Sequence, residues 1–549
     1  MMESQPPAIP KKGVNSESKE IGRASGILAL STLLSRVLGL LRNQILSHFF
    51  GAGLAADAFI AAFTIPNALR RLFGEGGLTP AFVSIFTRSL YDPKSNWRNF
   101  VSSSFLWLTL CLVVLSLLGM IFAPLLVWVY VPEFSQTPGK FEMTVQLTRF
   151  LFPFVLLICW AAFFMGILNS FKKFALPALG PAIMNFTIVC LAPLALWSGW
   201  IPEAQGIFVF SLCILIGVSI QLIVQLPTLR RLGALPKLSG PWLDPRVIEL
   251  GQLLLPAVFS MGIYQLNIIV NRVFASRIPG AVSHLYYSDL IIELPVSLIA
   301  TSMSVAAMPS FTRLLVEKKH HELGQTFKFS SCLNAGLAIP SMIGILVLSF
   351  PIISSIFFTG EFSLGDSQVS AEALCYYALG IPFYCLLRSL LPLFFADKDT
   401  KTPAIIGFVA LGVNFFGAWQ LSRIMGSPGI ALSTALSSFT QFSLLCVIAI
   451  YRYKFFPWLE VLKLIGKIGL AGSFMGLLLY GGSNLIPEYI WINKGISILK
   501  LLSLGGLIGL GVLTYGAGIH YLKIPAIEPL LRKIKTQITP ENSSTKPKS

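Results

Sequence analysis

The chain has 549 residues, of which 54% are hydrophobic and only 12% are charged, and its mean hydropathy is +0.75. Soluble domains carry about 25% charged residues, so this composition excludes an ordinary soluble protein and indicates a membrane protein. Many windows of about 20 mostly apolar residues can cross a membrane as helices, whereas the short alternating strands of a membrane barrel are not seen.

These windows predict an all-α polytopic membrane protein with fourteen transmembrane helices. Residues 1–24 form a polar, basic N-terminus without the short apolar core and cleavage site of a secretory signal, so the first helix is expected to be retained. The spans are expected at 25–50, 57–87, 101–130, 146–170, 177–199, 205–228, 248–276, 284–312, 329–358, 371–395, 403–422, 429–451, 461–482 and 496–521.

Basic residues are concentrated in alternate connections between the spans, and the intervening connections hold at most one each, such as Lys140, Arg277, Arg423 or Lys494. Because Lys and Arg are retained on the cytoplasmic side, we expect both termini to be cytoplasmic. The net charge of +17 is then explained by basic residues at the inner face of a membrane, next to anionic lipid. Nucleic-acid binding is disfavoured, since the bases are dispersed over many short loops.

Five short matches recur in the same order at offsets of 225 to 229 residues, and they predict an internal duplication. Six spans at 25–229 and six at 248–452 would form two lobes joined by a cytoplasmic linker at 230–247 and related by a pseudo-two-fold axis along the membrane normal. Two further helices at 453–523, in which Gly505 and Gly509 suit close packing, precede a polar cytoplasmic tail at 524–549. The matched pairs are Pro66/Pro295, Phe86/Phe311, Pro153/Pro382, Pro177/Pro403 and Asn185/Asn414.

Charged residues inside the spans are the candidate site, because a buried charge costs about 2.5 to 3.5 kcal/mol on insertion scales and usually pairs or lines water. In the first half the arginines outnumber the acids, so a cleft there would be cationic and would suit an anion such as phosphate. Two structural alternatives stay open: Arg71 and Glu75 are spaced to neutralise each other, and Asp57 is placed to cap a helix. The candidate substrate-binding residues are Arg36, Arg42, Asp57, Arg70, Arg71, Glu75, Arg272, Asp289, Glu293 and Arg388.

Helix-breaking residues in the second span predict a bendable segment at 66–80, with a static kink as the alternative; they are Pro66, Gly74, Gly76 and Gly77. No disulfide framework or metal site is expected, because the eight cysteines fall inside spans without a CxxC pair. Phosphate-binding and hydrolase motifs are also missing, which argues against an enzyme and a cofactor. Weak monovalent-ion candidates are Asn267, Asn271 and Asn414.

Four stretches of this sequence together resemble the MurJ (MviN) lipid II flippases of the MOP transporter superfamily. They are "SRVLGLLRNQILSHFFGAG", "ADAFIAAFTIPNALRRLFGEGGLTPAFV", "LYYSDLIIELP" and "DKDTKTP". The resemblance extends from about residue 22 to 523. It implies fourteen helices in two six-helix lobes plus two more, and a substrate made of undecaprenyl pyrophosphate carrying the disaccharide-pentapeptide of peptidoglycan.

The resemblance also assigns roles to residues of this chain. It implies that the cavity arginines are Arg36, Arg42, Arg70 and Arg71, and that Asp57, Asp289 and Glu293 are the matching acids. Two positions depart from the family pattern: Leu290 stands where the family usually has arginine, and Asn43 where it often has aspartate. We expect Arg272 to substitute for the missing arginine, since the predicted hairpin sets it at a depth similar to that of Leu290.

The expected mechanism is alternating access, with membrane potential or a monovalent cation as possible energy sources and peptidoglycan synthesis proteins as possible partners. One alternative is a MOP exporter of another substrate, an O-antigen lipid or a drug. A drug exporter for cations should have mostly acidic residues in its cleft, which is opposite to the pattern here. A membrane scaffold that transports nothing would need no charges inside its spans.

Overall fold

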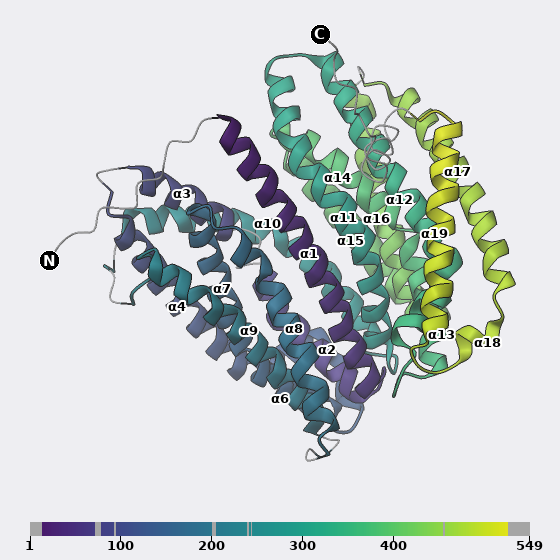
Figure 1. Cartoon of the computed structure of the whole chain (residues 1–549), viewed down its shortest axis with the longest axis horizontal. Helices are drawn as coiled ribbons and strands as arrows, with labels where there is room; N and C mark the ends of the chain where they lie inside the picture. Colours follow the sequence, from purple (N-terminus) through teal and green to yellow (C-terminus); the bar gives the residue numbers. More distant parts are fainter. Residues whose placement is uncertain are drawn as a thin grey trace, which may run out of the picture. The chain divides into compact units, whose positions relative to one another are not determined.

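The computed structural model describes residues 14–524 except 72–77, 93–94, 200–201, 203–204, 239–240, 243 and 454–455, and within this range it describes no side chains at 14–29, 80, 255–264 and 298–309. No strand occurs in the described residues, and the all-helical class is confirmed (Figure 1). The helices up to the first connection between halves are α1 (Val14–Phe50), α2 (Leu54–Arg70), α3 (Thr79–Tyr91), α4 (Trp97–Ile121), α5 (Ala123–Tyr130), the 3-10 turn η2 (Pro132–Gln136), α6 (Lys140–Leu151), α7 (Pro153–Ser170), α8 (Ala175–Trp197) and α9 (Gly206–Arg231).

The second part of the chain continues the same pattern of long apolar helices. They are α10 (Pro245–Ala275), α11 (Ala281–Val316), α12 (His320–Phe357), α13 (Leu364–Ala378), α14 (Ile381–Ala396), α15 (Lys401–Met425), α16 (Ser427–Arg452), α17 (Trp458–Leu485), α18 (Glu488–Ile492) and α19 (Ile498–Tyr521). Every predicted span overlaps helical residues. Among the described residues, ten helical segments are long and apolar enough to cross a membrane by length and composition; the count of fourteen spans stays a prediction.

Large apolar side chains are exposed along these helices, as expected for a surface that faces lipid. Leu194 is 70% exposed, Leu477 71% and Val512 67%. A soluble monomer rarely exposes contiguous apolar patches of more than a few hundred Å². The exposure therefore agrees with the membrane class derived from composition.

The contacts divide the chain into two compact units, each made of segments that are not contiguous in the sequence. Unit 1 comprises residues 1–45, 62–127 and 142–262, and unit 2 comprises residues 46–61, 128–141 and 263–549. The lobe boundaries expected from the repeat stay predictions.

The core of unit 1 is built from aromatic rings of α3, α4 and α7. The Phe82 ring lies 5.3 Å from that of Phe86, 5.6 Å from that of Phe100 and 4.5 Å from that of Phe163, measured between centroids. Such pairs stabilise a core beyond the area they bury. They fix α3, which follows the segment 72–77, against two long apolar helices.

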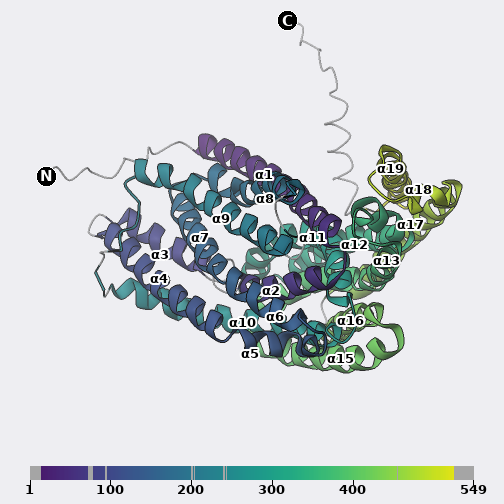
Figure 2. The same ribbon diagram turned by 90° about the horizontal axis from the view of Figure 1, so that it is seen from below.

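Unit 2 contains an extra helical pair, α17 and α19, which pack against each other while α17 packs on α12 (Figures 1 and 2). A Cβ atom at Gly476 would lie 2.6 Å from Ile343 Cγ2, and one at Gly511 3.3 Å from Leu479 Cδ1. The expectation for Gly505 and Gly509 was wrong, because a Cβ at either would meet no described atom within 4 Å. The expectation extended to the neighbouring glycines, and close approach does occur at Gly511 of α19, as well as at Gly472 and Gly476 of α17.

Candidate functional site

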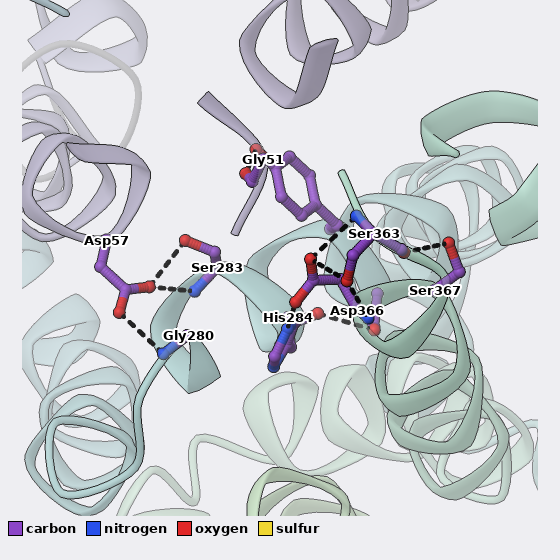
Figure 3. Close-up of polar contacts among 10 residues, drawn as sticks. Gly51, Asp57, Gly280, Ser283, His284, Ser363, Asp366 and Ser367 are labelled. Carbon is purple, nitrogen blue, oxygen red and sulfur yellow. Dashed lines mark hydrogen bonds and ion pairs between the residues drawn. The ribbon is translucent and has the colours of Figure 1, made fainter. Parts of the chain in front are cut away.

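Asp57 lies in the first turn of α2 and is fully buried in unit 2. Its carboxylate accepts hydrogen bonds from the backbone N–H of Gly280 (3.1 Å), the backbone N–H of Ser283 (2.9 Å) and the Ser283 hydroxyl (2.6 Å), as Figure 3 shows. The Lys140 ammonium lies 2.7 Å from Oδ2. Asp57 therefore does act as a cap, but for the N-terminus of α11 and not for its own helix.

The start of α11 depends on this outside partner. Gly280, the N-cap residue, has a φ of +73° and no side chain to bond the free N–H groups of the first turn. The Asp57 carboxylate, which comes from α2, accepts hydrogen bonds from two of those groups. Its negative charge also interacts favourably with the positive end of the helix dipole. The last residue of this turn, His284, contacts a carboxylate of α13.

His284 and Asp366 connect the first turn of α11 to the first turn of α13 (Figure 3). The His284 Nε2 atom lies 2.8 Å from Asp366 Oδ1, and the ring is only slightly exposed. Asp366 also forms a capping box with Ser363, whose hydroxyl accepts from the Asp366 N–H at 3.0 Å while Asp366 Oδ2 accepts from the Ser363 N–H. Two helix N-termini of unit 2 are thus tied together by acids.

A cavity of about 390 Å³ adjoins these groups within unit 2. Besides the Asp57–Lys140 pair, a second ion pair lines it, in which Arg277 Nε lies 3.3 Å from Glu133 Oε1. Further lining residues are Gln136, Thr137, Ser276, Gly280 and Asp366. Only a weak signal for this cluster is present in the sequence: Lys140 and Arg277 are single basic residues in connections that otherwise lack them. Their partners are too distant in the chain to be inferred.

The predicted arginines of the first half lie in unit 1 and are half-buried; they are Arg36, Arg42, Arg70 and Arg71. Arg42 donates to the side-chain oxygens of Asn185 (3.2 Å) and Asn43 (3.5 Å). Arg70 Nε donates to Asn67 Oδ1 at 2.8 Å. Amide partners orient a guanidinium without cancelling its charge.

The predicted bendable segment is described only in part. Pro66 is buried inside α2, which continues through it to Arg70. The other predicted hinge residues, Gly74, Gly76 and Gly77, lie outside the described residues. Glu75 lies outside them as well, so its expected pairing with Arg71 stays a prediction.

The charged candidates of the second half lie in unit 2, and none of them is among the described residues that line the cavity beside Asp57. Asp289 is exposed and Glu293 half-buried on α11, and Arg388 is exposed on α14. Arg272 Nη1 donates to the Val282 carbonyl at 2.8 Å. This contact places Arg272 against the first turn of α11, eight residues or about 12 Å of helix before Leu290, because α11 begins earlier than the predicted span. The expectation of similar depth was wrong.

The three asparagines proposed as ion candidates are brought together in unit 2. Asn414 Nδ2 donates to the side-chain oxygens of Asn267 (3.1 Å) and Asn271 (2.9 Å). The Asn414 oxygen accepts from Ser433 at 3.0 Å, and Asn271 Nδ2 donates to Thr434 Oγ1. The amides therefore satisfy one another, and no group of three or more His, Cys, Asp or Glu in the described part of the chain could hold a metal ion.

Comparison with known proteins places this architecture. The family profile described as "Lipid II flippase MurJ" matches residues 46–499. The chain belongs to the MurJ family. A probable lipid II flippase MurJ of Bdellovibrio bacteriovorus is 31% identical over 498 residues, which cover 89% of this chain and 93% of the relative. One from Vibrio cholerae is 29% identical over 508 residues, covering 91% and 95%.

Solved structures agree on the fold. "Lipid II flippase MurJ, inward closed conformation" superposes with a TM-score of 0.74 at 24% identity, covering 92% of this chain and 99% of that one. An inward-facing multidrug resistance MATE transporter of the MOP superfamily gives a TM-score of 0.65 at 12% identity, covering 76% and 94%. The MurJ-like fold is thus shared with transporters of other substrates, so substrate must be argued from the residues and the family.

Proposed function

We propose that this MurJ-family protein is a lipid II flippase, which moves the undecaprenyl-pyrophosphate-linked precursor of peptidoglycan from the cytoplasmic to the periplasmic leaflet by alternating access. The family match over residues 46–499 carries the proposal. The protein would work in the bacterial inner membrane with both termini in the cytoplasm. We assign it no catalytic step and no cofactor.

Arg42 supports an anionic substrate. Within the described residues its partners are carboxamide oxygens, so its positive charge is oriented but not neutralised. A guanidinium matches the oxygens of a pyrophosphate by paired hydrogen bonds. We assign the pyrophosphate to Arg42 together with Arg36, Arg70 and Arg71, all on helices of unit 1.

The energy source is proposed to be the membrane potential. Moving one elementary charge through 100 mV is worth about 2.3 kcal/mol, enough to bias the return of a cationic site. Anionic lipids would contact the basic cytoplasmic loops, and proteins of peptidoglycan synthesis would use the product.

Complementation tests the function. The host flippase is depleted, and the full chain, Arg42→Ala, Arg42→Lys and Arg423→Ala are expressed in turn. We expect growth and outer-face lipid II, detected with a membrane-impermeant probe, with the wild type and with Arg423→Ala, whose exposed arginine lies over the Trp419 ring. Arg42→Ala should fail, and Arg42→Lys should rescue only in part.

Failure of the wild-type chain at normal expression, while the depleted host is rescued by its own flippase, would refute the lipid II assignment. Export of an O-antigen lipid or a drug by the same cells would then support the other MOP substrates. Full rescue by Arg42→Ala would keep the function and refute the role of this arginine.

A further inference from the structure

The segment 128–141 is part of unit 2, although the sequence around it on both sides belongs to unit 1. It contains the end of α5, η2 and the first residues of α6, and residues 131–141 of it are predicted from the sequence only as part of a connection between two spans. Two of its side chains form ion pairs with other parts of unit 2: Lys140 with Asp57, and Glu133 with Arg277. These two pairs differ strongly in burial.

The Lys140–Asp57 pair is dry. The Lys140 side chain is 7% exposed and that of Asp57 0%, and their charged atoms are 2.7 Å apart. The ammonium also lies 4.0 Å from the centre of the Phe134 ring, where a cation is attracted by the π-system. By contrast, Arg277 and Glu133 are 43% and 25% exposed and 3.3 Å apart, a geometry in which an ion pair contributes little.

Lys140 supplies the unit charge that opposes the buried Asp57 carboxylate. The other partners of Asp57 are two backbone N–H groups and one hydroxyl, all from residues 280–283. Neutral donors orient a carboxylate but supply no opposite unit charge, and removing one member of a buried ion pair leaves the other uncompensated. The bonds from Asp57 to the first turn of α11 therefore depend on Lys140, a residue of segment 128–141.

We propose that Lys140 is the positioning residue of Asp57: it holds the carboxylate on the N-terminus of α11, so that segment 128–141 controls how firmly the starts of α2 and α11 are joined. The adjoining cavity of about 390 Å³ is lined by both Asp57 and Lys140, and a charge pair weakens when water enters beside it. This inference rests on the proposed function, since joining and release of helix ends is what an alternating-access cycle requires.

Hydrogen exchange measured by mass spectrometry tests the proposal directly, because the Gly280 and Ser283 N–H groups are themselves the bonded atoms. Purified full-length protein is compared as wild type, Lys140→Met, Lys140→Arg and, as matched control, Arg277→Met. In the peptide covering 276–290, Lys140→Met should exchange roughly tenfold faster or more, as expected for loss of a buried partner. Lys140→Arg should restore slow exchange, and Arg277→Met should change it little.

The proposal is overturned if folded Lys140→Met exchanges like the wild type, or if Lys140→Arg exchanges as fast as Lys140→Met. Should Lys140→Met not accumulate, Asp57→Asn and the double variant Asp57→Asn/Lys140→Met decide. Coupled residues predict that the double variant unfolds at the same or a higher temperature than Asp57→Asn, and an additive further loss would contradict the proposal. Exchange is read without substrate, so its outcome is independent of whether the chain rescues a flippase-depleted host.

Discussion

At the scale of single residues, the contrast between Arg42 and Asp57 shows how one protein treats charges inside apolar helices in two ways. Asp57 is paired with a lysine and accepts three hydrogen bonds, so its charge is compensated within the protein. Arg42 meets amide oxygens, and its charge stays available to a ligand. In this protein, charge compensation distinguishes a charged residue with a structural role from one that can bind a ligand.

Asn185→Asp tests this distinction. The new carboxylate would face Arg42 Nη1, which now lies 3.2 Å from the amide oxygen, and would neutralise it. We expect transport in the complementation assay to be lost. The bond from Asn185 Nδ2 to the Ser35 carbonyl is lost in this variant and in Asn185→Ala alike, so it does not distinguish them. Asn185→Ala removes the hydrogen bond but leaves the positive charge, and should retain partial transport. Equal activity of the two variants would contradict the interpretation.

Asp399 gives a pH-dependent prediction outside the spans. The Thr402 backbone N–H and hydroxyl, and then the Arg452 guanidinium, lower the pKa of Asp399 to about 2 against the opposing effect of burial. A carboxyl whose pKa is lower in the folded state stabilises the fold above its unfolded pKa of about 3.9, and this contribution declines as the pH falls toward 2.

Asp399→Asn should therefore unfold at a lower temperature than the wild type near neutral pH, and the difference should shrink below about pH 4. Thermal unfolding in detergent across this range measures it. Glu488→Gln, which removes an exposed acid, is the control. A difference that stays constant into acid would show that Asp399 acts through packing instead of charge.

The residue scale also marks the limit of sequence reasoning. Composition and depth in a span identified Arg42 and Asp57 as unusual, because a charge in hydrocarbon is expensive wherever it occurs. The side chains that contact Asp57, those of Lys140 and Ser283, are 83 and 226 positions away in the chain. No local pattern carries that information.

At the scale of elements, bonds at the helix N-termini connect α2, α11 and α13 within unit 2. α11 is capped by Asp57 and α13 by its own capping box, and His284 pairs the two. Sequence hydropathy located the helices, but it merged α4 with α5 and part of α13 with α14, because breaks at turns change hydropathy little. Helix starts were also misplaced: α11 begins three residues before the predicted span, and this shift moved Arg272 away from Leu290.

Ser363→Ala should destabilise the start of α13 by about 1 kcal/mol, the usual effect of losing an N-cap side chain. Its hydroxyl accepts from the Asp366 N–H and donates to the Asp366 carboxylate. Chemical or thermal unfolding in detergent measures the loss. Ser341→Ala is the control, since that hydroxyl bonds only a carbonyl of its own helix. An equal effect of both substitutions would show that the capping box contributes nothing.

At the scale of the whole molecule, hydropathy and loop charge were sufficient to predict an all-helical membrane protein, because lipid requires every backbone group to be bonded within helices or closed barrels. The attachment of α17 and α19 was not predictable, since α19 is rich in glycines and only the packing shows which of them are used. Gly505 and Gly509 have open space, whereas Gly472 and Gly476 on α17 meet Ile343 of α12.

Gly476→Val should weaken the docking of α17 on α12, because the added carbon atoms overlap Ile343 and overpacking costs about 1 to 3 kcal/mol. Gly469→Val is matched for helix and residue type but meets no atom within 4 Å. We expect a lower unfolding temperature and faster proteolysis between α16 and α17 for Gly476→Val only. Identical behaviour of the two variants would rule out a tight contact at Gly476.

The asparagine cluster has an electrical consequence. Asn267, Asn271 and Asn414 satisfy one another with neutral groups, and an electric field exerts no net force on neutral groups. This cluster therefore carries no net charge through the field, and the charge that moves in a voltage-driven cycle comes from ionised groups such as the half-buried arginines of unit 1 and a bound pyrophosphate. Replacing Asn414 by aspartate would install a voltage-sensitive group at a place where the present chain has none.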